Sequence, residues 1–580
     1  MAAQHMAAQS PTPTDNGIAQ RLADFPTLTD ALDYAAGGAG GVNFYSARGA
    51  LEDVLSWAAL REQALAVAGR LLGRGLAPGD RVAIVAETES DFHRALMGCL
   101  YARLVPCPAP LPSAFGSRAG YVEQIRRIAD VASIAAAISP AMFGNWVADA
   151  LEGRRLAFVG TLADLDNAPE RPPGAGERPA DEIAYLQFSS GTTSFPKGIA
   201  VTHAAMMANI RAMAVHAFQM REGDRGVSWL PYYHDMGLVG CVMLPIATQM
   251  SADFIKTRDF ILRPGNWLDL ISRYRGTMTY APSFGYDLAA RRSRPRDDLD
   301  LASLRIAGIG GDIIKMANIR SFAETFAEAG FRPESFLPSY GMAEASLGLA
   351  FAPLGSGART EPVDVDRLRD EHIAAAPGGT ARSREFAICG RPLPDHEIEI
   401  RDAAGTALPE SRVGQIFVRG PSVMQGYFGN PEETALVLSP DGWLDTGDLG
   451  YMRGGEIVVT GRVKDLIIIN GRNIWPQDIE WSVESQVDGA KEGSVAAFQL
   501  ADEGADETDA GRVAVVVECR RRQPQEREAL RAAAHAVVRG VCGIEARVAL
   551  CAPGALPRTS SGKLSRTRAR EMFLAGAFDA

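Results

Sequence analysis

Strand-like and helix-like patterns alternate along most of the chain, and this alternation limits the folds that it can adopt. Residues 50–76 have the apolar spacing of a helix, and Gly75 ends it. A β-rich run over 79–87 follows, then a helical pattern over 90–104 and a strand-like run over 104–110. Because strands that alternate with helices form largely parallel sheets with helices on both faces, we predict an α/β fold.

The length of 580 residues is too great for one hydrophobic core, so two or more domains are expected. The pattern changes to short strands over 386–459 and changes again at Lys464. We therefore predict a large N-terminal domain over 18–463, with mixed or parallel sheets, helices and a β-rich subdomain. A small, mobile α+β domain over 464–580 completes the chain, and residues 1–17 are expected to be disordered or introduced by cloning.

Composition excludes several classes of protein. The net charge of −11 argues against a nucleic-acid binder, and no apolar run approaches the roughly 18 residues that span a membrane. The N-terminus lacks the basic and apolar order of a signal peptide. Seven scattered cysteines without a CxxC pair indicate thiols in a reducing compartment, not a zinc site or disulfide frame. We predict a cytoplasmic protein with no membrane span and no nucleic-acid partner.

A loop rich in Ser, Thr and Gly lies within "LQFSSGTTSFPKGIAVTH", residues 186–203. A phosphate-binding P-loop would need Gly-Lys-Ser/Thr at the start of a helix, but Lys197 stands between Pro196 and Gly198. A loop of small residues can still surround a polyphosphate with backbone N–H groups and hydroxyls. The alternative for such a loop is an ordinary turn.

Two further motifs suit nucleotide binding. In "PSYGMAEAS", Tyr340 could stack on a base and Glu344 could ligate Mg²⁺. In "GWLDTGDLG" and "TGRVKD", Asp448 and Arg462 could bind ribose hydroxyls. Taken singly, these residues are more readily a core aromatic, a solvated helix carboxylate, a turn aspartate and a surface arginine.

Lysine is rare, with six residues among 59 basic ones, so a retained lysine is more often needed for its compact ammonium. Lys197, Lys464 and Lys563 fall inside the motifs. Lys563, in "LPRTSSGKLSR", is seventeen residues from the end, and its alternative is a solvated basic tail. His234, beside Asp235 in "YYHDMG", has no nearby nucleophile and is weak evidence for acid–base chemistry.

In their order and spacing, "FSSGTTSFPKG", "YGMAEAS", "GWLDTGDLG", "GRVKDLIIINGRN" and "LPRTSSGKL" resemble the core motifs of the adenylate-forming superfamily. Within it, the chain looks most like the fatty acyl-AMP ligases, from about residue 40 to the end. "GCLYARLVPCPAPLP", "YVEQIRRI", "LPYYHDMGLVG", "GPSVMQGYFGNPEETA" and "GRNIWPQDIE" carry that likeness. So does the polar segment 354–386, where those ligases have an insertion that ordinary CoA ligases lack.

The resemblance implies a role for each motif. The loop would hold the β- and γ-phosphates of ATP through Ser190, Gly191, Thr192, Thr193 and Lys197. Residues around the adenine and ribose would be Gly310, Gly311, Asp312, Tyr340, Gly341, Met342, Asp448 and Arg462. Glu344 would hold Mg²⁺, and Lys464 would be the hinge. The catalytic set would comprise Lys563, Glu344, Thr192 and His234, with Lys563 reaching the fatty carboxylate and α-phosphate.

Four positions depart from the family pattern. Ser194 stands where Gly or Arg is commoner, and Trp475 replaces Tyr. In "GGDII", Asp312 replaces Glu and Ile313 replaces Pro, so the adenine-side role of Asp312 has less support than those of Glu344 and Asp448.

The reaction implied is attack of a fatty carboxylate on the α-phosphorus of ATP, followed by acyl transfer to an acyl carrier protein. Two basic clusters, Arg520 to Arg522 and Arg558 to Arg570, could steer that acidic partner. The alternatives are an acyl-CoA synthetase that uses free CoA and a non-catalytic binding protein on the same scaffold.

Overall fold

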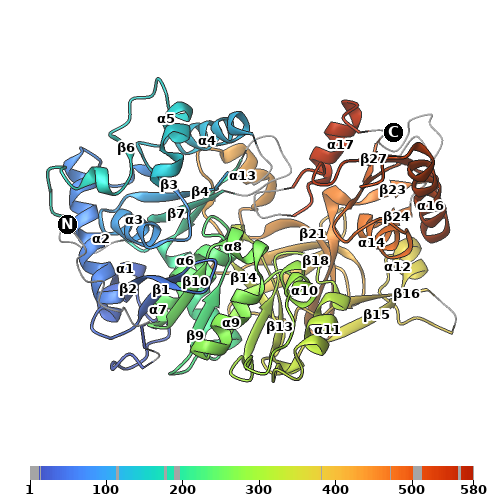
Figure 1. Ribbon diagram of the computed structural model, residues 1–580, viewed down its shortest axis with the longest axis horizontal. Coiled ribbons are helices and arrows are strands. Elements are labelled where there is room, and N and C mark those ends of the chain that lie inside the picture. Colours follow the sequence, from blue (N-terminus) through green and yellow to red (C-terminus); the bar gives the residue numbers. More distant parts are fainter. Residues whose placement is uncertain are drawn as a thin grey trace.

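The computed structural model describes residues 12–13, 15–112, 117–174, 179–188, 196–379, 382–469, 472–500, 513–558 and 563–578. In Figure 1 a large N-terminal part, coloured blue to orange, lies beside a smaller C-terminal part in red. The mixed sheets with helices on their faces confirm the predicted α/β class.

The central element is a large sheet that is parallel through its middle and antiparallel at both edges. Its strands alternate with helices along the chain, which is the pattern that the sequence predicts. In spatial order the strands are β17 (Arg391–Pro392), β14 (Gly348–Phe351), β13 (Phe336–Gly341), β12 (Ile306–Ile309), β11 (Met278–Ala281), β9 (Arg225–Ser228), β10 (Ser251–Ile255), β1 (Gly41–Tyr45) and β2 (Leu51–Ser56).

Smaller sheets complete the N-terminal part. A parallel sheet has the order β4 (Val105–Ala109), β3 (Arg81–Val85), β5 (Ala136–Ile138) and β6 (Phe158–Gly160). An antiparallel sheet joins β20 (Gly426–Tyr427), β8 (Gly198–Thr202) and β7 (Ile183–Phe188). The β-rich region is an antiparallel sheet of β18 (Glu397–Arg401), β19 (Gly414–Arg419), β21 (Leu444–Arg453) and β22 (Glu456–Arg462).

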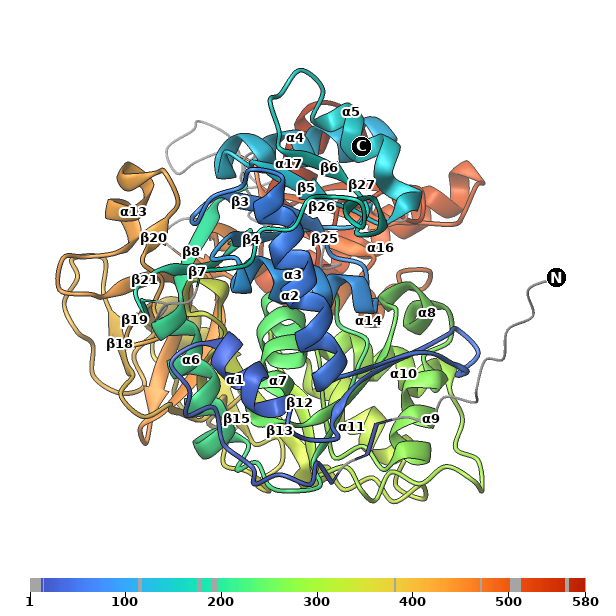
Figure 2. The same cartoon turned by 90° about the vertical axis from the view of Figure 1, so that its left-hand side faces the viewer.

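Helices cover these sheets, and polar caps fix where several of them begin. Thr202 accepts a hydrogen bond from the Ala205 amide and so begins α6, as its residue type predicts. Figure 2 shows α2 and α3 side by side, with α3 packed on β3 and β4. The α-helices of this part are α1 (Leu28–Ala35), α2 (Trp57–Gly73), α3 (Ser90–Tyr101), α4 (Arg118–Ala132), α5 (Gly144–Ala150), α6 (His203–Ala212), α7 (Leu244–Thr248), α8 (Thr257–Leu262), α9 (Gly265–Tyr274), α10 (Ser283–Arg292), α11 (Met316–Thr325), α12 (Val365–Glu371) and α13 (Pro431–Val437).

Short stretches of other helix types stand between these elements. Two stretches are π-helical, η3 (Met213–Ala217) and η4 (Met236–Met243). The 3₁₀ turns are η1 (Ala141–Phe143), η2 (Ala163–Leu165), η5 (Pro333–Ser335), η6 (Ala343–Ala345) and η7 (Val463–Asp465). Because π-helical turns are uncommon and gather at functional sites, η4 is a candidate functional segment.

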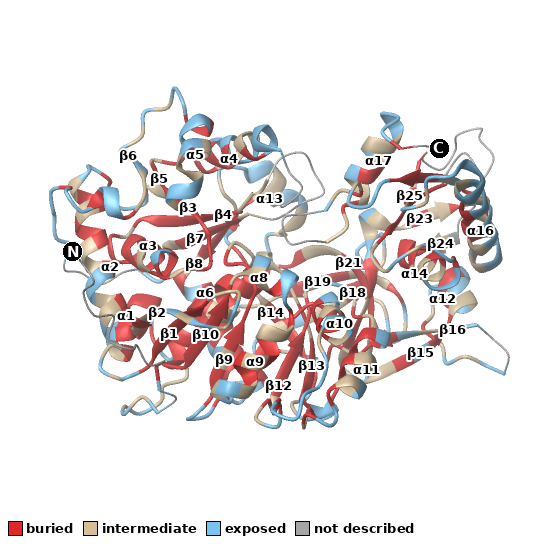
Figure 3. Cartoon of the chain, viewed as in Figure 1, coloured by how far each residue is buried: buried red, intermediate tan, exposed pale blue. Residues whose placement is uncertain are grey.

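The C-terminal part has hydrophobic clusters of its own, one centred on Ile479 and Val515 and another on Phe498 and Val516. Buried strands, red in Figure 3, form the interior of both parts. The elements are β23 (Ile467–Ile469), β24 (Arg472–Ile474), α14 (Pro476–Gln486), β25 (Val495–Gln499), β26 (Val513–Glu518), α16 (Pro524–Cys542), β27 (Arg547–Cys551) and α17 (Arg566–Leu574). The domain boundary at Lys464 remains a prediction.

The polar segment 354–386 is ordered where it is described. It forms a hairpin of β15 (Thr360–Asp364) and β16 (Ser383–Ala387) around α12. Arg384 pairs with Asp478 of α14, and Arg382 donates to the Val541 carbonyl of α16. This segment therefore contacts the C-terminal part directly.

Among the described residues, no helix is long and apolar enough to cross a membrane. The described cysteines all carry free thiols, and most are buried.

Candidate active site between the two parts of the chain

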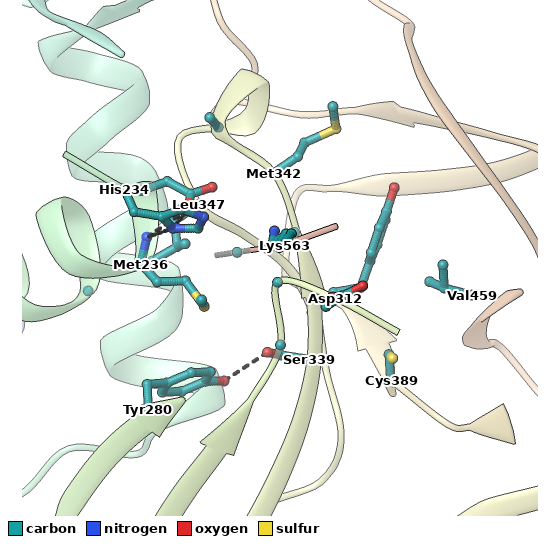
Figure 4. A pocket seen from close by; sticks show the side chains of 18 of the residues that line it. His234, Met236, Tyr280, Asp312, Ser339, Met342, Leu347, Cys389, Val459 and Lys563 are labelled. Carbon is teal, nitrogen blue, oxygen red and sulfur yellow. Dashed lines mark hydrogen bonds and ion pairs between the residues drawn. The ribbon is translucent and has the colours of Figure 1, made fainter. Parts of the chain in front are cut away.

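A cavity of about 570 Å³ opens where the large sheet, the β-rich sheet and the C-terminal part meet. Its wall includes residues that follow β9, β12 and β13, so it lies at the carboxyl edge of the parallel strands, where α/β proteins bind ligands. Figure 4 shows side chains from both parts of the chain pointing into it, among them His234, Asp312 and Lys563.

A trio of interacting side chains lines one wall of the cavity, with Tyr340 and Asp448 buried and Arg462 exposed. Tyr340, at the end of β13, donates a 2.9 Å hydrogen bond to Asp448 Oδ2, and Arg462 Nε lies 3.2 Å from Asp448 Oδ1. Burial raises the pKa of the Asp448 carboxyl above its ordinary value, although the Arg462 charge and the Tyr340 hydrogen bond oppose that rise. The structure thus brings Tyr340 together with two residues that lie more than a hundred positions away in the sequence.

Glu344, on η6, places a second carboxylate in the same cavity. Its Oε1 accepts a 3.2 Å hydrogen bond from the Tyr427 hydroxyl, and burial raises its carboxyl pKa. The described residues hold no cluster of three metal-ligating side chains. A single carboxylate in a polar cavity fits Mg²⁺ that takes its other ligands from nucleotide phosphates and water.

Lys197, just before β8, pairs with Glu433 of α13 and lies 4.6 Å from the centre of the Tyr427 ring. It lines the cavity, and the Tyr427 ring that its ammonium faces belongs to the tyrosine that donates to Glu344. Residues 189–195 precede it, and the predicted phosphate contacts of Ser190, Gly191, Thr192 and Thr193 lie outside the described residues.

His234 lies on the loop between β9 and η4, with its Nδ1 beside Asp235 Oδ1. Burial raises the pKa of the Asp235 carboxyl, but the charges of His234 and Lys563 outweigh it, so the net pKa is lowered. An ionised Asp235 therefore orients His234 at the cavity wall. The charge of Lys563 reaches this pair from the C-terminal part.

The loop after β12 presents Gly310, Gly311 and Asp312 to the cavity. Gly311 has φ +80°, and a Cβ there would lie 2.8 Å from Met236 Cε and 3.9 Å from Lys563 Nζ. The ammonium from near the C-terminus thus lies within van der Waals reach of this loop. Gly311 and Lys563 are far apart in the sequence, and they come together because the C-terminal part folds over the cavity.

The remaining predicted positions also line the cavity. Gly341 admits no side chain, because a Cβ would lie 1.9 Å from the Leu347 carbonyl oxygen. Met342 follows it, and Lys464 is exposed on η7, between the two parts of the chain. The exchange of Tyr for Trp475 places a buried indole against Gly461.

One large region of the cavity was not predicted from sequence. An apolar channel crosses the face of the large sheet beneath η4, and its wall contains Met213, Phe218, Gly226, Met250, Ala252, Met278, Leu347 and Phe351. These residues are scattered over five elements and the loops between them without a shared motif, so only the fold reveals them. Met236 also lines the cavity, whereas Phe284 is exposed and Tyr286 is buried with its hydroxyl on the Gly308 carbonyl.

The basic cluster predicted near the C-terminus is partly internal. Arg566, with its side chain 14% exposed, lies between Asp465, at 2.6 Å, and Glu480, at 2.7 Å. It joins the first turn of the C-terminal part to α14 and is not free to attract a partner protein. Arg558 and Arg570 donate to backbone carbonyls.

Comparison with known proteins agrees with this geometry. The family model described as "AMP-binding enzyme" matches residues 44–428. The chain belongs to the AMP-binding enzyme family. Its similarity to a long-chain-fatty-acid–AMP ligase of Mycolicibacterium smegmatis, at 32% identity over 93% of this chain and 92% of the relative, places this AMP-binding enzyme with the fatty acyl-AMP ligases.

Two other comparisons extend over nearly the whole enzyme. A solved structure from a study of fatty acyl-adenylate ligases of E. coli and L. pneumophila has a TM-score of 0.91 and 42% identity, and the match covers 96% of this chain and all of that one. A Caulobacter vibrioides protein that carries the provisional name acyl-CoA synthetase is 49% identical over 98% of each chain.

Proposed function

We propose that this AMP-binding enzyme activates a fatty acid with ATP and passes the acyl group to the phosphopantetheine thiol of an acyl carrier protein. The proposal rests on one observation. The Lys563 ammonium, the Tyr340–Asp448–Arg462 trio and an apolar channel share a single cavity. A cation, a ribose-binding carboxylate and an apolar channel are the features that a fatty acid and ATP together require.

In the first step, a carboxylate oxygen of the acid bonds to the α-phosphorus, and the bond from that phosphorus to the bridging oxygen of pyrophosphate breaks. No proton needs to move, so the enzyme acts by positioning and by neutralising charge. In this proposal Lys563, beside Gly311, neutralises the carboxylate and α-phosphate, and Lys197, beside Tyr427 and Glu433, acts on the other phosphates. Mg²⁺ held at Glu344 would neutralise the phosphates further.

In the second step, a thiolate attacks the acyl carbonyl, a thioester forms, and AMP leaves. We propose that the C-terminal part turns about Lys464 between the steps, because Lys563 fills the site in the first. A structure of an L. pneumophila fatty acyl-adenylate ligase with acyl adenylate and pyrophosphate, 28% identical with a TM-score of 0.71, supports the first step.

The second candidate is an acyl-CoA synthetase, which differs only in its acceptor. The provisional name of the Caulobacter relative favours it. The purified enzyme with ATP, Mg²⁺ and a panel of fatty acids, followed by mass spectrometry, separates the two. Acyl-AMP that persists with free CoA and is consumed by a holo acyl carrier protein is the expected result. Rapid acyl-CoA formation would establish the synthetase instead, and no pyrophosphate with any acid would leave only a binding protein.

A further inference from the structure

Three exposed apolar side chains gather on two helices near the active site. Ile261 and Leu262 of α8 are 47% and 72% exposed, and Phe284 of α10 is 39% exposed. They make up three of the seven large hydrophobic side chains that are exposed in the described part of the chain. Figure 2 shows α8, α9 and α10 together along one side of the molecule.

Direct contacts join the two helices. Arg292 of α10 donates to the Ile261 carbonyl at 3.1 Å. The Trp229 ring stacks on Phe260 of α8 at 3.8 Å and meets the Phe284 ring edge-on at 5.9 Å. The apolar side chains therefore belong to one surface, here called the α8–α10 patch.

The patch is basic in a protein of net charge −11. Residues 256–263 and 284–294 contain six Lys or Arg against two Asp, a net of +4. Both aspartates are largely covered, with Asp259 and Asp287 side chains 13% and 9% exposed. Arg258 and Arg291 are 57% and 55% exposed, so the charge that faces solvent is positive.

The patch lies at the same edge of the sheet as the cavity. One residue separates β10 from α8, and one separates β11 from α10. Thr257, the first residue of α8, donates to the Trp229 carbonyl at 2.8 Å, and Trp229 begins the loop that carries His234. At its other side, Arg291 lies 3.5 Å from Glu492 of the C-terminal part.

We propose that the α8–α10 patch is the docking surface for the acyl carrier protein, a proposal that rests on the proposed function. The partner is an acidic protein whose exposed helix combines carboxylates with apolar side chains and whose thiol arm must enter the cavity. Complementary charge favours encounter with such a surface, and exposed apolar area beside it provides the contact. Free CoA has no folded surface to fill this patch.

The test measures acyl transfer from preformed acyl-adenylate to a purified holo acyl carrier protein of fatty-acid synthesis. The natural enzyme is compared with two variants. One is the double variant Arg258→Glu with Arg292→Glu, and the other is the single variant Leu262→Asp. We expect kcat/KM for the carrier to fall about tenfold, chiefly through KM, with a smaller charge effect at high salt, because charges at an interface rim act on association. Pyrophosphate release without carrier, and transfer to free pantetheine, should stay unchanged.

Arg275→Glu is the matched control, because Arg275 is 71% exposed beyond α9, at the opposite edge of the sheet. It should leave transfer unchanged. The docking surface would be overturned if kcat/KM were equal in all variants, or if the control lost as much as they do. It would also be overturned if the variants changed the oligomeric state of the enzyme and not its acyl transfer. None of these outcomes would contradict the proposed reaction. A natural enzyme that forms acyl-adenylate but acylates no carrier would overturn both the docking surface and the proposed acceptor.

Discussion

At the scale of single residues, Lys563 is the side chain on which the first reaction step depends most. Its Nζ is 3.9 Å from the position of a Cβ on Gly311, and its charge lowers the pKa of Asp235. We expect Lys563→Ala to lower the rate of adenylation by roughly 10²–10³, the usual cost of one charge-stabilising group. Pyrophosphate release measures it, with Lys491→Ala, an exposed lysine of the same part, as control. Near-normal adenylation would remove Lys563 from the site.

The Tyr340 hydroxyl should set the pH dependence of ATP binding. Because burial raises the pKa of Asp448, this carboxyl takes up a proton at a higher pH than an ordinary aspartate and then releases Arg462 and the ribose. Tyr340→Phe removes a hydrogen bond that favours the charged carboxylate. KM for ATP, which rises as the pH falls, should therefore begin to rise at a pH about 1 unit higher than in the natural enzyme. Profiles that coincide for the two enzymes would contradict this coupling.

At the scale of elements, the strand order sets the length of the apolar channel. Its wall runs from Tyr340 on β13 to Ala252 on β10, four strand spacings apart, or about 19 Å. A Cβ on Gly226 would lie 3.2 Å from Met250 Cε, so this end is already tight. We expect Gly226→Val to reduce kcat/KM for long acids at least tenfold and to spare short ones. Gly226→Ala should be intermediate, and an equal loss at every chain length would indicate general damage instead.

The elements also show what the sequence predicts and what it leaves hidden. The βα alternation and the Thr202 cap are local signals, and both are found in the structure. Several residues that the motifs single out, such as Tyr340 and Lys563, line one cavity, and their roles there stay predictions. The channel could not be foreseen, since it forms only when η4 lies across strands distant in sequence. The hairpin within 354–386 likewise packs on the C-terminal part, and Arg566 pairs with Glu480 within that part. Both depend on contacts between residues distant in sequence.

At the scale of the whole molecule, a charged cluster joins the two parts of the chain. Lys315 of the N-terminal part lies 3.1 Å from Glu492 and 3.6 Å from Glu484, and Asn318 donates to Glu492 at 2.8 Å. Burial raises the pKa of Glu484 to about 7, with nearby Glu480 and Glu492 adding to the rise and Lys315 and the Gly493 amide opposing it. Asn318 and Lys315 instead outweigh burial at Glu492, whose pKa is lowered.

These opposite shifts predict opposite effects of neutralising the two carboxyls. A raised folded pKa means that the protonated Glu484 is preferred, so its stabilisation is complete below the unfolded pKa and is lost as pH rises toward 7. Glu484→Gln should therefore stabilise the enzyme at about pH 8, by up to about 3 kcal/mol, and lose that advantage near about pH 4.5. Glu492→Gln should destabilise at about pH 8, because its ionised form is the stabilising one. Calorimetric Tm values across pH test both, and shifts of the same sign would refute this account of the junction.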